Sequence, residues 1–125
     1  MVVDTSAILA VFFNERHGPW VSDRLREART ALRMSTVNYA EALILLRDRQ
    51  PGLWEEMRDR VLRSSIRLVP PTPLQAEIAA GARVRYPLNL GDCFAYALAK
   101  DEDVPLLTLD RDFRRTDIAL VQPST

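Results

Sequence analysis

The chain has 125 residues, of which 47% are hydrophobic, and this length and composition predict one globular domain covering residues 1–125. Its 17 basic and 17 acidic residues balance, so net charge gives no argument for a nucleic-acid partner, which would have to bind a local basic patch. A single cysteine, Cys93, and a single histidine, His17, exclude an internal disulfide and a cysteine-based zinc cage, and disfavour a Ser-His-Asp triad.

Short aliphatic runs alternate with longer helical patterns, which is typical of an α/β fold with a mostly parallel sheet. The first half predicts a strand over 2–4, helices over 7–13 and 19–29, a strand over 32–34, and helices over 37–49 and 53–63. Hydroxyls at Thr5 and Ser6 suit the start of the first helix, and those at Ser35 and Thr36 suit the third. The second half predicts a strand over 66–69, helices over 74–85 and 92–100, a strand over 105–109, and an edge strand over 118–121.

Two aspartates follow predicted strands. Asp4 ends the first strand, and Asp110 follows the strand over 105–109, with Asp112 two residues further on. Ligands of open α/β sheets gather outside the carboxyl ends of the strands, so both side chains are expected to face a common crevice. The competing interpretation of Asp4 is that it only caps the following helix.

Two further acids lie on the apolar faces of predicted helices. Glu41 has Val37, Ile44 and Leu45 as neighbours on its own face, and Asp92 opens a helix whose facing residues are small or aromatic. A carboxylate in apolar surroundings needs a cation or hydrogen bonds to offset the cost of desolvation. Taken singly, Glu41 is equally compatible with a structural ion pair, and Asp92 with a favourable interaction at the helix N-terminus.

Carboxylates that converge without a counter-charge repel one another, and a bound dication resolves that repulsion economically. An all-oxygen site favours Mg²⁺, with Mn²⁺ as a substitute, and such an ion fills its coordination shell with water and substrate phosphate. The chemistry expected of this arrangement is phosphodiester hydrolysis, in which the metal activates water and polarises the phosphoryl group.

Four segments together resemble the VapC toxins of bacterial toxin-antitoxin pairs, which are PIN-domain ribonucleases. They span nearly the whole chain in the order found in that family: MVVDTSA at 1–7, STVNYAEA at 35–42, LNLGDCFAYALA at 88–99 and PLLTLDRDF at 105–113. The resemblance implies a PIN-like three-layer sandwich with a mostly parallel central sheet flanked by helices. It also implies Mg²⁺-dependent endoribonuclease activity on RNA, frequent homodimers, and inhibition by a VapB-type antitoxin.

Carried over by position, Asp4, Glu41 and Asp92 match the acidic site of the family. Relatives carry the fourth acid where either Asp110 or Asp112 stands, so both are candidate metal ligands, and Asp110 is taken as the catalytic one. The resemblance makes the hydroxyls of three further residues candidate substrate contacts: Thr5, Ser6 and Thr108.

Two other functions stay open. One is a PIN-fold interaction module that binds a partner without cutting RNA. The other is a phosphoacceptor signalling domain, which fits poorly, since such domains carry adjacent acids after the first strand and a late lysine, whereas Lys100 lies in a predicted helix. The chain lacks a signal-peptide pattern and a membrane-length apolar stretch, so we expect a cytoplasmic protein without a membrane partner.

The early helices carry more large apolar residues than a small core needs. These are predicted to form a surface for the antitoxin, although each also fits simple packing against the sheet. The members of this set are Val11, Phe12, Phe13, Trp20 and Trp54.

Overall fold

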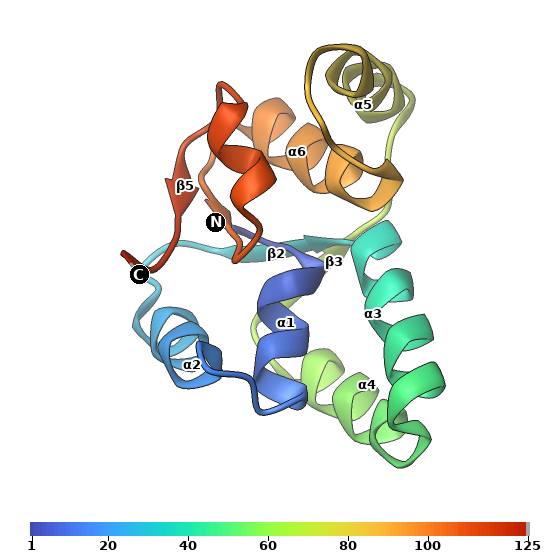
Figure 1. The fold of residues 1–125 in the computed structure, drawn as a ribbon, viewed down its shortest axis with the longest axis vertical. Helices are drawn as coiled ribbons and strands as arrows, with labels where there is room; N and C mark the ends of the chain where they lie inside the picture. The colour runs from blue at the N-terminus through green and yellow to red at the C-terminus, as the bar shows by residue number, and fades with distance from the viewer. Residues whose placement is uncertain (125) are drawn as a thin grey trace.

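The structure is a computed structural model that describes residues 1–124. Its strands form one parallel sheet in the order β3-β2-β1-β4-β5 (Figure 1). The strands are β1 (Val2–Val3), β2 (Leu32–Ser35), β3 (Ile66–Val69), β4 (Leu106–Leu107) and β5 (Leu120–Val121). The predicted α/β class with a parallel central sheet is therefore confirmed, including β5 at the edge of the sheet.

Helices cover both faces of the sheet (Figure 1). The α-helices are α1 (Thr5–Phe12), α2 (Gly18–Glu27), α3 (Thr36–Arg49), α4 (Trp54–Arg63), α5 (Pro73–Arg85) and α6 (Leu90–Glu102). Two short 3-10 helices, η1 (Pro51–Leu53) and η2 (Arg111–Arg115), precede α4 and follow β4. None of the helices in residues 1–124 has the length and apolar character that crossing a membrane requires.

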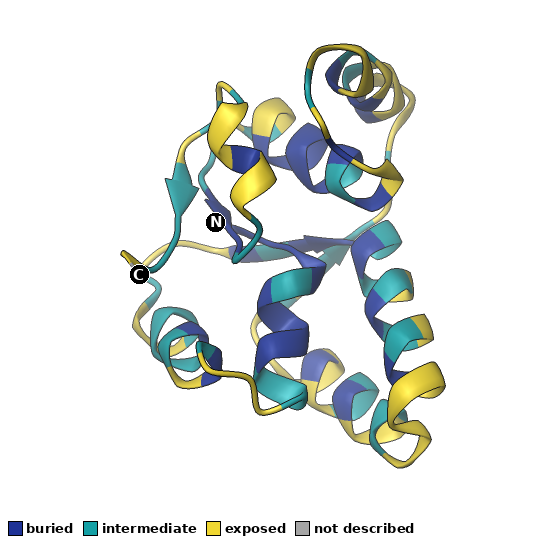
Figure 2. Cartoon of the chain, in the orientation of Figure 1, coloured by how far each residue is buried: buried dark blue, intermediate teal, exposed yellow. Residues whose placement is uncertain are grey.

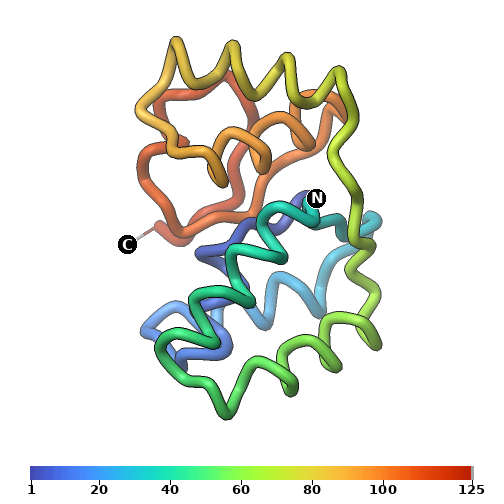
Figure 3. Tube along the Cα trace, turned by 90° about the vertical axis from the view of Figure 1, so that its right-hand side faces the viewer, coloured from blue at the N-terminus to red at the C-terminus, as the bar shows by residue number. Residues whose placement is uncertain are grey.

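Alternating side chains of the central strands divide the core into two halves. Val3 and Leu107 pack with the helices α1 to α4, whereas Val2 and Leu106 pack with α5, α6 and Phe113. This alternation is the period of two that a strand imposes on its side chains. Figure 2 shows the buried residues facing the sheet on both sides, and Figure 3 shows the two helical layers from the side. Strand β1, buried on both faces, is thus placed at the centre of a three-layer sandwich.

The boundaries of several elements differ from those expected, for local reasons. Asp4, rather than Thr5 or Ser6, caps α1, because its carboxylate accepts from the backbone N–H of Ala7. Helix α6 begins at Leu90 rather than Asp92, with Asn89 as its cap. The strand expected over 105–109 pairs only at Leu106–Leu107, after which the hydroxyls of Ser6 and Thr108 accept from the backbone N–H groups of Leu109 and Asp110.

Candidate active site

Asp4 follows the buried strand β1 and is itself only 3% exposed. Its Oδ1 accepts hydrogen bonds from Ser6 Oγ at 2.7 Å and from Ala7 N at 3.0 Å, while its Oδ2 accepts from Thr108 Oγ1 at 2.5 Å. Burial, the largest cause, and the nearby charge of Asp110 raise the pKa of the Asp4 carboxyl to about 6, although these hydrogen bonds act in the opposite direction. Asp4 therefore caps α1, and it is also a buried carboxyl group with a raised pKa at the carboxyl end of β1.

The hydroxyls of Ser6 and Thr108 join the ends of β1 and β4. Ser6 Oγ accepts from Leu109 N at 3.0 Å, and Thr108 Oγ1 accepts from Asp110 N at 3.0 Å. Since each hydroxyl also donates to Asp4, the segment that carries Asp110 is fixed relative to Asp4. The structure thus places Ser6 and Thr108 in contact with the acids, and their contact with a substrate stays a prediction.

Glu41 lies in α3 and faces the N-terminal turns of α1 and α6. Thr5 Oγ1 donates to Glu41 Oε1 at 2.5 Å, and the carboxylate packs on Gly91, where an added Cβ would stand 2.6 Å from Oε2. The apolar face expected around Glu41 is incomplete, since Ile44 is 66% exposed. The carboxylate of Glu41 thus contacts the Thr5 hydroxyl of α1 and Gly91 of α6.

Asn38 is a site residue that sequence reasoning missed. It is 1% exposed, and its Nδ2 donates to Gly91 O at 3.0 Å and to Thr5 Oγ1 at 3.3 Å. Because a hydroxyl has one proton, Thr5 accepts from Asn38 and directs that proton to Glu41. Asn38 lies one helical turn before Glu41, which is the only sequence signal that marks it.

Asp92 lies in the first turn of α6 and forms a capping box with Asn89. Asp92 N donates to Asn89 Oδ1 at 2.8 Å, and Asn89 N donates to Asp92 Oδ2 at 3.3 Å. Burial raises the pKa of Asp92 to about 7, with further contributions from the charges of Asp110, Asp4 and Glu41, while the bond from Asn89 acts in the opposite direction. Asp92 thus caps α6 and also lies close enough to Asp4, Glu41 and Asp110 for their charges to raise its pKa.

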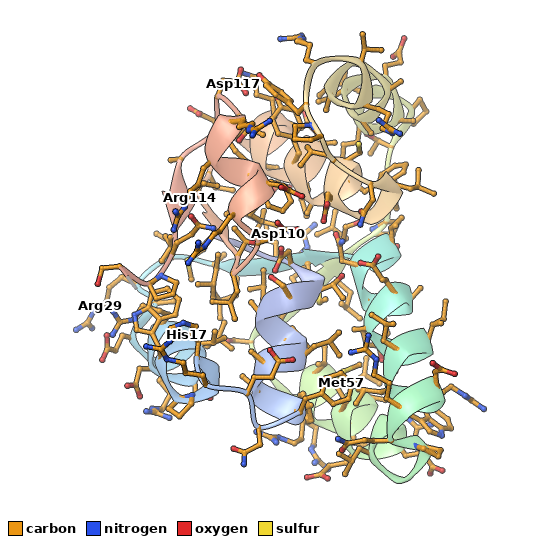
Figure 4. The ribbon with its side chains drawn as sticks, viewed as in Figure 1. His17, Arg29, Met57, Asp110, Arg114 and Asp117 are labelled. Carbon is orange, nitrogen blue, oxygen red and sulfur yellow. The ribbon has the colours of Figure 1, made fainter. Side chains whose placement is uncertain are left out.

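The two candidates for the fourth acid differ in position. Asp110 is half-buried beside the first turn of α1 (Figure 4), and its Oδ1 caps η2 by accepting from Asp112 N at 2.9 Å. Asp112 is exposed within η2, whereas Asp110 is among the main charges that raise the pKa of Asp4 and of Asp92. Phe113, fully buried, anchors η2 to the core. Of the two candidates, Asp110 is therefore the one that lies close enough to Asp4 and Asp92 to affect their pKa values.

The acids lack basic partners: within residues 1–124, the ion pairs include none of Asp4, Glu41, Asp92, Asp110 and Asp112. In the side-chain conformations of that part of the chain, no three Asp, Glu, His or Cys groups are placed to ligate one ion directly. The all-oxygen donor set still fits Mg²⁺, which retains several waters and needs few protein ligands. An ion held partly through water fits Asp4, Glu41, Asp92 and Asp110, and direct ligation by Asp4 requires its hydroxyl donors to turn away.

The chain matches known proteins along nearly its full length. The model of the PIN domain matches residues 1–119. The chain is 38% identical to a Ribonuclease VapC of Mycolicibacterium smegmatis, covering 97% of this chain and 99% of that protein, and 37% identical to Ribonuclease VapC30 of Mycobacterium tuberculosis, covering 97% and 98%. The chain belongs to the PIN domain family, in its VapC branch.

Solved structures agree on the fold. The crystal structure of VapC20 from Mycobacterium tuberculosis, titled a sarcin-ricin loop cleaving toxin, has a TM-score of 0.84 at 19% identity and covers 98% of each chain. VapBC2 from Rickettsia felis, bound to a DNA fragment from its promoter, has a TM-score of 0.82 at 13% identity, covering 97% of this chain and 96% of that one. At these identities the likeness supports the fold and carries no residue assignment.

Proposed function

We propose that this chain is a Mg²⁺-dependent endoribonuclease and the toxin of a VapBC-type toxin-antitoxin pair. The ribonuclease class follows from its membership of the VapC branch, whose members at 37–38% identity are named ribonucleases. The observation that carries the catalytic proposal is the convergence of four acids, Asp4, Glu41, Asp92 and Asp110, without a basic partner. Family membership removes the support for a phosphoacceptor domain.

The residues of the site have separable roles in this proposal. When bound, Mg²⁺ supplies a Lewis acid for the phosphoryl oxygens and lowers the pKa of a bound water. Asp4, held by Ser6 and Thr108, provides a fixed carboxylate for the ion. In the metal-free protein burial raises the pKa of Asp92 to about 7, and a bound dication would favour the ionised carboxylate, which can hold the ion or orient the water bound to it.

Chelation tests the catalytic proposal. RNA cleavage by the purified protein should stop with excess chelator and return on addition of Mg²⁺ or Mn²⁺. The variants Glu41→Gln and Asp92→Asn, purified in the same way, control for a contaminating nuclease and should be inactive with metal present. Cleavage that continues after chelation, and is lost in both variants, would contradict the metal mechanism. Full folding and partner binding without any cleavage would favour the interaction module.

A groove between α1, α2 and α4 supports the proposed antitoxin site. It measures about 350 Å³, and Val11, Phe12 and Leu25 contribute apolar side chains while Arg26 and Arg60 add charge. An amphipathic segment with an acidic residue opposite Arg60 fits such a surface, since Arg26 already pairs with Asp23. Solved structures with this fold include VapBC2, which supports a VapB-type partner.

The five apolar residues expected to bind this partner divide in the structure. All five are partly buried, and only Val11 and Phe12 line the groove. Phe12 also lies under the Arg60 guanidinium, and the other three contact arginines outside the groove: Phe13 with Arg49, Trp20 with Arg24, and Trp54 between Arg47 and Arg58. Substitutions of Val11 and Phe12, which line the groove, therefore test partner binding more directly than substitutions of the other three residues.

Copurification with the antitoxin encoded beside this chain should weaken in Val11→Asp, since a charge in an apolar groove is costly to desolvate. Val84→Asp is the matched control, because Val84 is 87% exposed on α5 and lies outside the groove. Equal retention of the antitoxin by both folded variants would place the interface elsewhere. A homodimer and a cytoplasmic location stay predictions, and light scattering of the purified chain would test the first.

A further inference from the structure

We infer that a small basic cleft beside the candidate active site binds a phosphate of the RNA strand that flanks the cleaved bond. The cleft is lined by His17, Leu109, Arg111, Arg114, Gln122 and Pro123, and it measures about 50 Å³. A cleft of that volume has room for a few water molecules, and therefore for a phosphate group. The inference rests on the proposed ribonuclease function.

The cleft is attached to the active site by direct hydrogen bonds. Leu109, in its wall, donates its backbone N–H to Ser6 Oγ at 3.0 Å, and Ser6 in turn donates to Asp4. Gln122, also in its wall, donates Nε2 to Asp110 O at 2.8 Å. Figure 4 shows Arg114 and His17 on the same side of Asp110. The cleft therefore adjoins the segment that carries Asp110, where a strand bound at the acids can reach it.

Arg114 is held in position before any ligand arrives. Its Nε donates to Gln122 Oε1 at 3.0 Å, so one amide connects Arg114 to the backbone of Asp110. The remaining guanidinium N–H groups are left for a ligand. The helix that carries Arg114, η2, is fixed by buried Phe113 and by a bond from Thr116 Oγ1 to Phe113 O at 2.6 Å. Prior ordering of this kind reduces the entropy lost on binding.

The charges of the cleft are uncompensated. Within the described residues, Arg111 and Arg114 take part in no ion pair, although Asp110 and Asp112 are near in sequence. Four carboxylates repel a polyanion everywhere except at the bound cation, so neighbouring phosphates need a separate basic contact. An arginine fork suits a phosphate oxygen pair, and such contacts fix the register of the strand without reading its bases.

Methylphosphonate substitution tests the inference. The probe is a fluorescein-labelled single-stranded RNA 20-mer of mixed sequence, bound in Mg²⁺ to the full chain made cleavage-deficient by Asp92→Asn. Arg114→Gln should weaken binding about tenfold, because hydrogen bonds to charged groups are stronger than neutral ones. It should also reduce the slope of log affinity against log salt by roughly 0.7, the share of one phosphate in a single strand.

One phosphate of the RNA at a time is replaced by an uncharged methylphosphonate. At one position, the replacement should weaken RNA binding to the chain that keeps Arg114. The same replacement should leave RNA binding by Arg114→Gln unchanged, because the contact is already lost. Gln122→Glu, which places a carboxylate beside Arg114, should weaken binding as much. Arg67→Gln, an exposed substitution on β3, should not. Only variants whose melting temperature equals that of the parent chain are compared, so that a loss of binding does not reflect unfolding.

Outcomes separate the two proposals. If the unaltered chain cleaves RNA and Arg114→Gln binds the probe equally well, the cleft has no role in RNA binding and the inference is wrong. A loss of antitoxin binding in Arg114→Gln, with RNA binding unchanged, would also overturn it and assign the cleft to the partner. If the unaltered chain cleaves no RNA under any metal condition, the proposed function fails first.

Discussion

Gly91 lies directly against the carboxylate of Glu41, so that a Cβ at position 91 would stand 2.6 Å from Oε2 and 2.7 Å from Oε1. Gly91 has an ordinary negative φ, so the glycine is required by this close approach and not by the backbone. The contact sets the spacing between α3, which carries Glu41, and α6, which carries Asp92.

Gly91→Ala should therefore displace Glu41 and lower kcat by about tenfold to a hundredfold, with the fold retained, since a shift of about 1 Å in a catalytic group has effects of this size. Gly81→Ala is the control, because nothing lies within 4 Å of its added methyl group in α5. The control should keep full activity and gain a little stability from the helix propensity of alanine. Equal kcat for the two variants would show that the contact does not position Glu41.

Asn38→Leu should weaken Mn²⁺ binding as well as stability. It removes the side-chain donor to Gly91 O, which keeps its helical bond within α6, at a cost of about 0.5–1.5 kcal/mol in the free energy of unfolding. It also removes the donor that fixes the hydroxyl of Thr5 toward Glu41. Thr5→Val breaks the same chain of hydrogen bonds one step later. Calorimetric titration with Mn²⁺ should show that the two substitutions together cost less affinity than the sum of their single effects. Additive losses would indicate that the two residues act separately.

The stability of the metal-free protein should fall as pH rises from about 4 to 7. The unfolded chain releases the protons of Asp4 and Asp92 near the ordinary value of 3.8, whereas the folded chain holds them to about 6 and 7. Between these values the folded state binds more protons, so the free energy of unfolding decreases with pH. Asp4 alone accounts for about 3 kcal/mol of this decrease. Thermal melts in chelator at pH 5 and pH 8 measure it.

Two comparisons accompany those melts. Asp4→Asn should show a weaker pH dependence, because the carboxamide does not titrate. Addition of Mg²⁺ should raise the melting temperature more at pH 8 than at pH 5, since only ionised carboxylates attract the ion. A metal-free melting temperature that rises from pH 5 to pH 8 would contradict the raised pKa values at this site.

Asp110→Asn should lower the cleavage rate more than Asp112→Asn, and both should lower it less than Asp4→Asn. Asp110 is half-buried and close enough to raise the pKa of Asp4 and Asp92, whereas Asp112 is exposed. Each carboxamide keeps the shape of the side chain and removes its charge, so the series compares electrostatic contributions. Rates at saturating Mg²⁺ decide the order, and a larger loss at Asp112 would reverse the assignment of the fourth acid.

The strand before Asp110 ends earlier than predicted, at Leu107. Local patterns did predict the layered α/β class, the strand over 66–69, and the position of Asp4 directly after β1. These features depend on the period of hydrophobic residues and on chain direction, both of which can be read along a sequence. The roles of Asn38 and Gly91 could not be predicted in this way, because they depend on contacts between residues more than 30 positions apart. The exposure of Ile44 was missed for a related reason: the periodic pattern of α3 does not say which part of the helix the neighbouring elements cover.

The bond between Asp4 and Thr108 joins residues 104 positions apart, and it has a consequence for the order of synthesis and folding. Asp4 is synthesised well before strand β4, which pairs with β1, and before the acid Asp110. Contacts of such long sequence separation form late, because a long loop must close before they contribute. A nascent chain that has not yet reached β4 thus lacks both Thr108 and Asp110, so its set of acids is incomplete until that segment has been made.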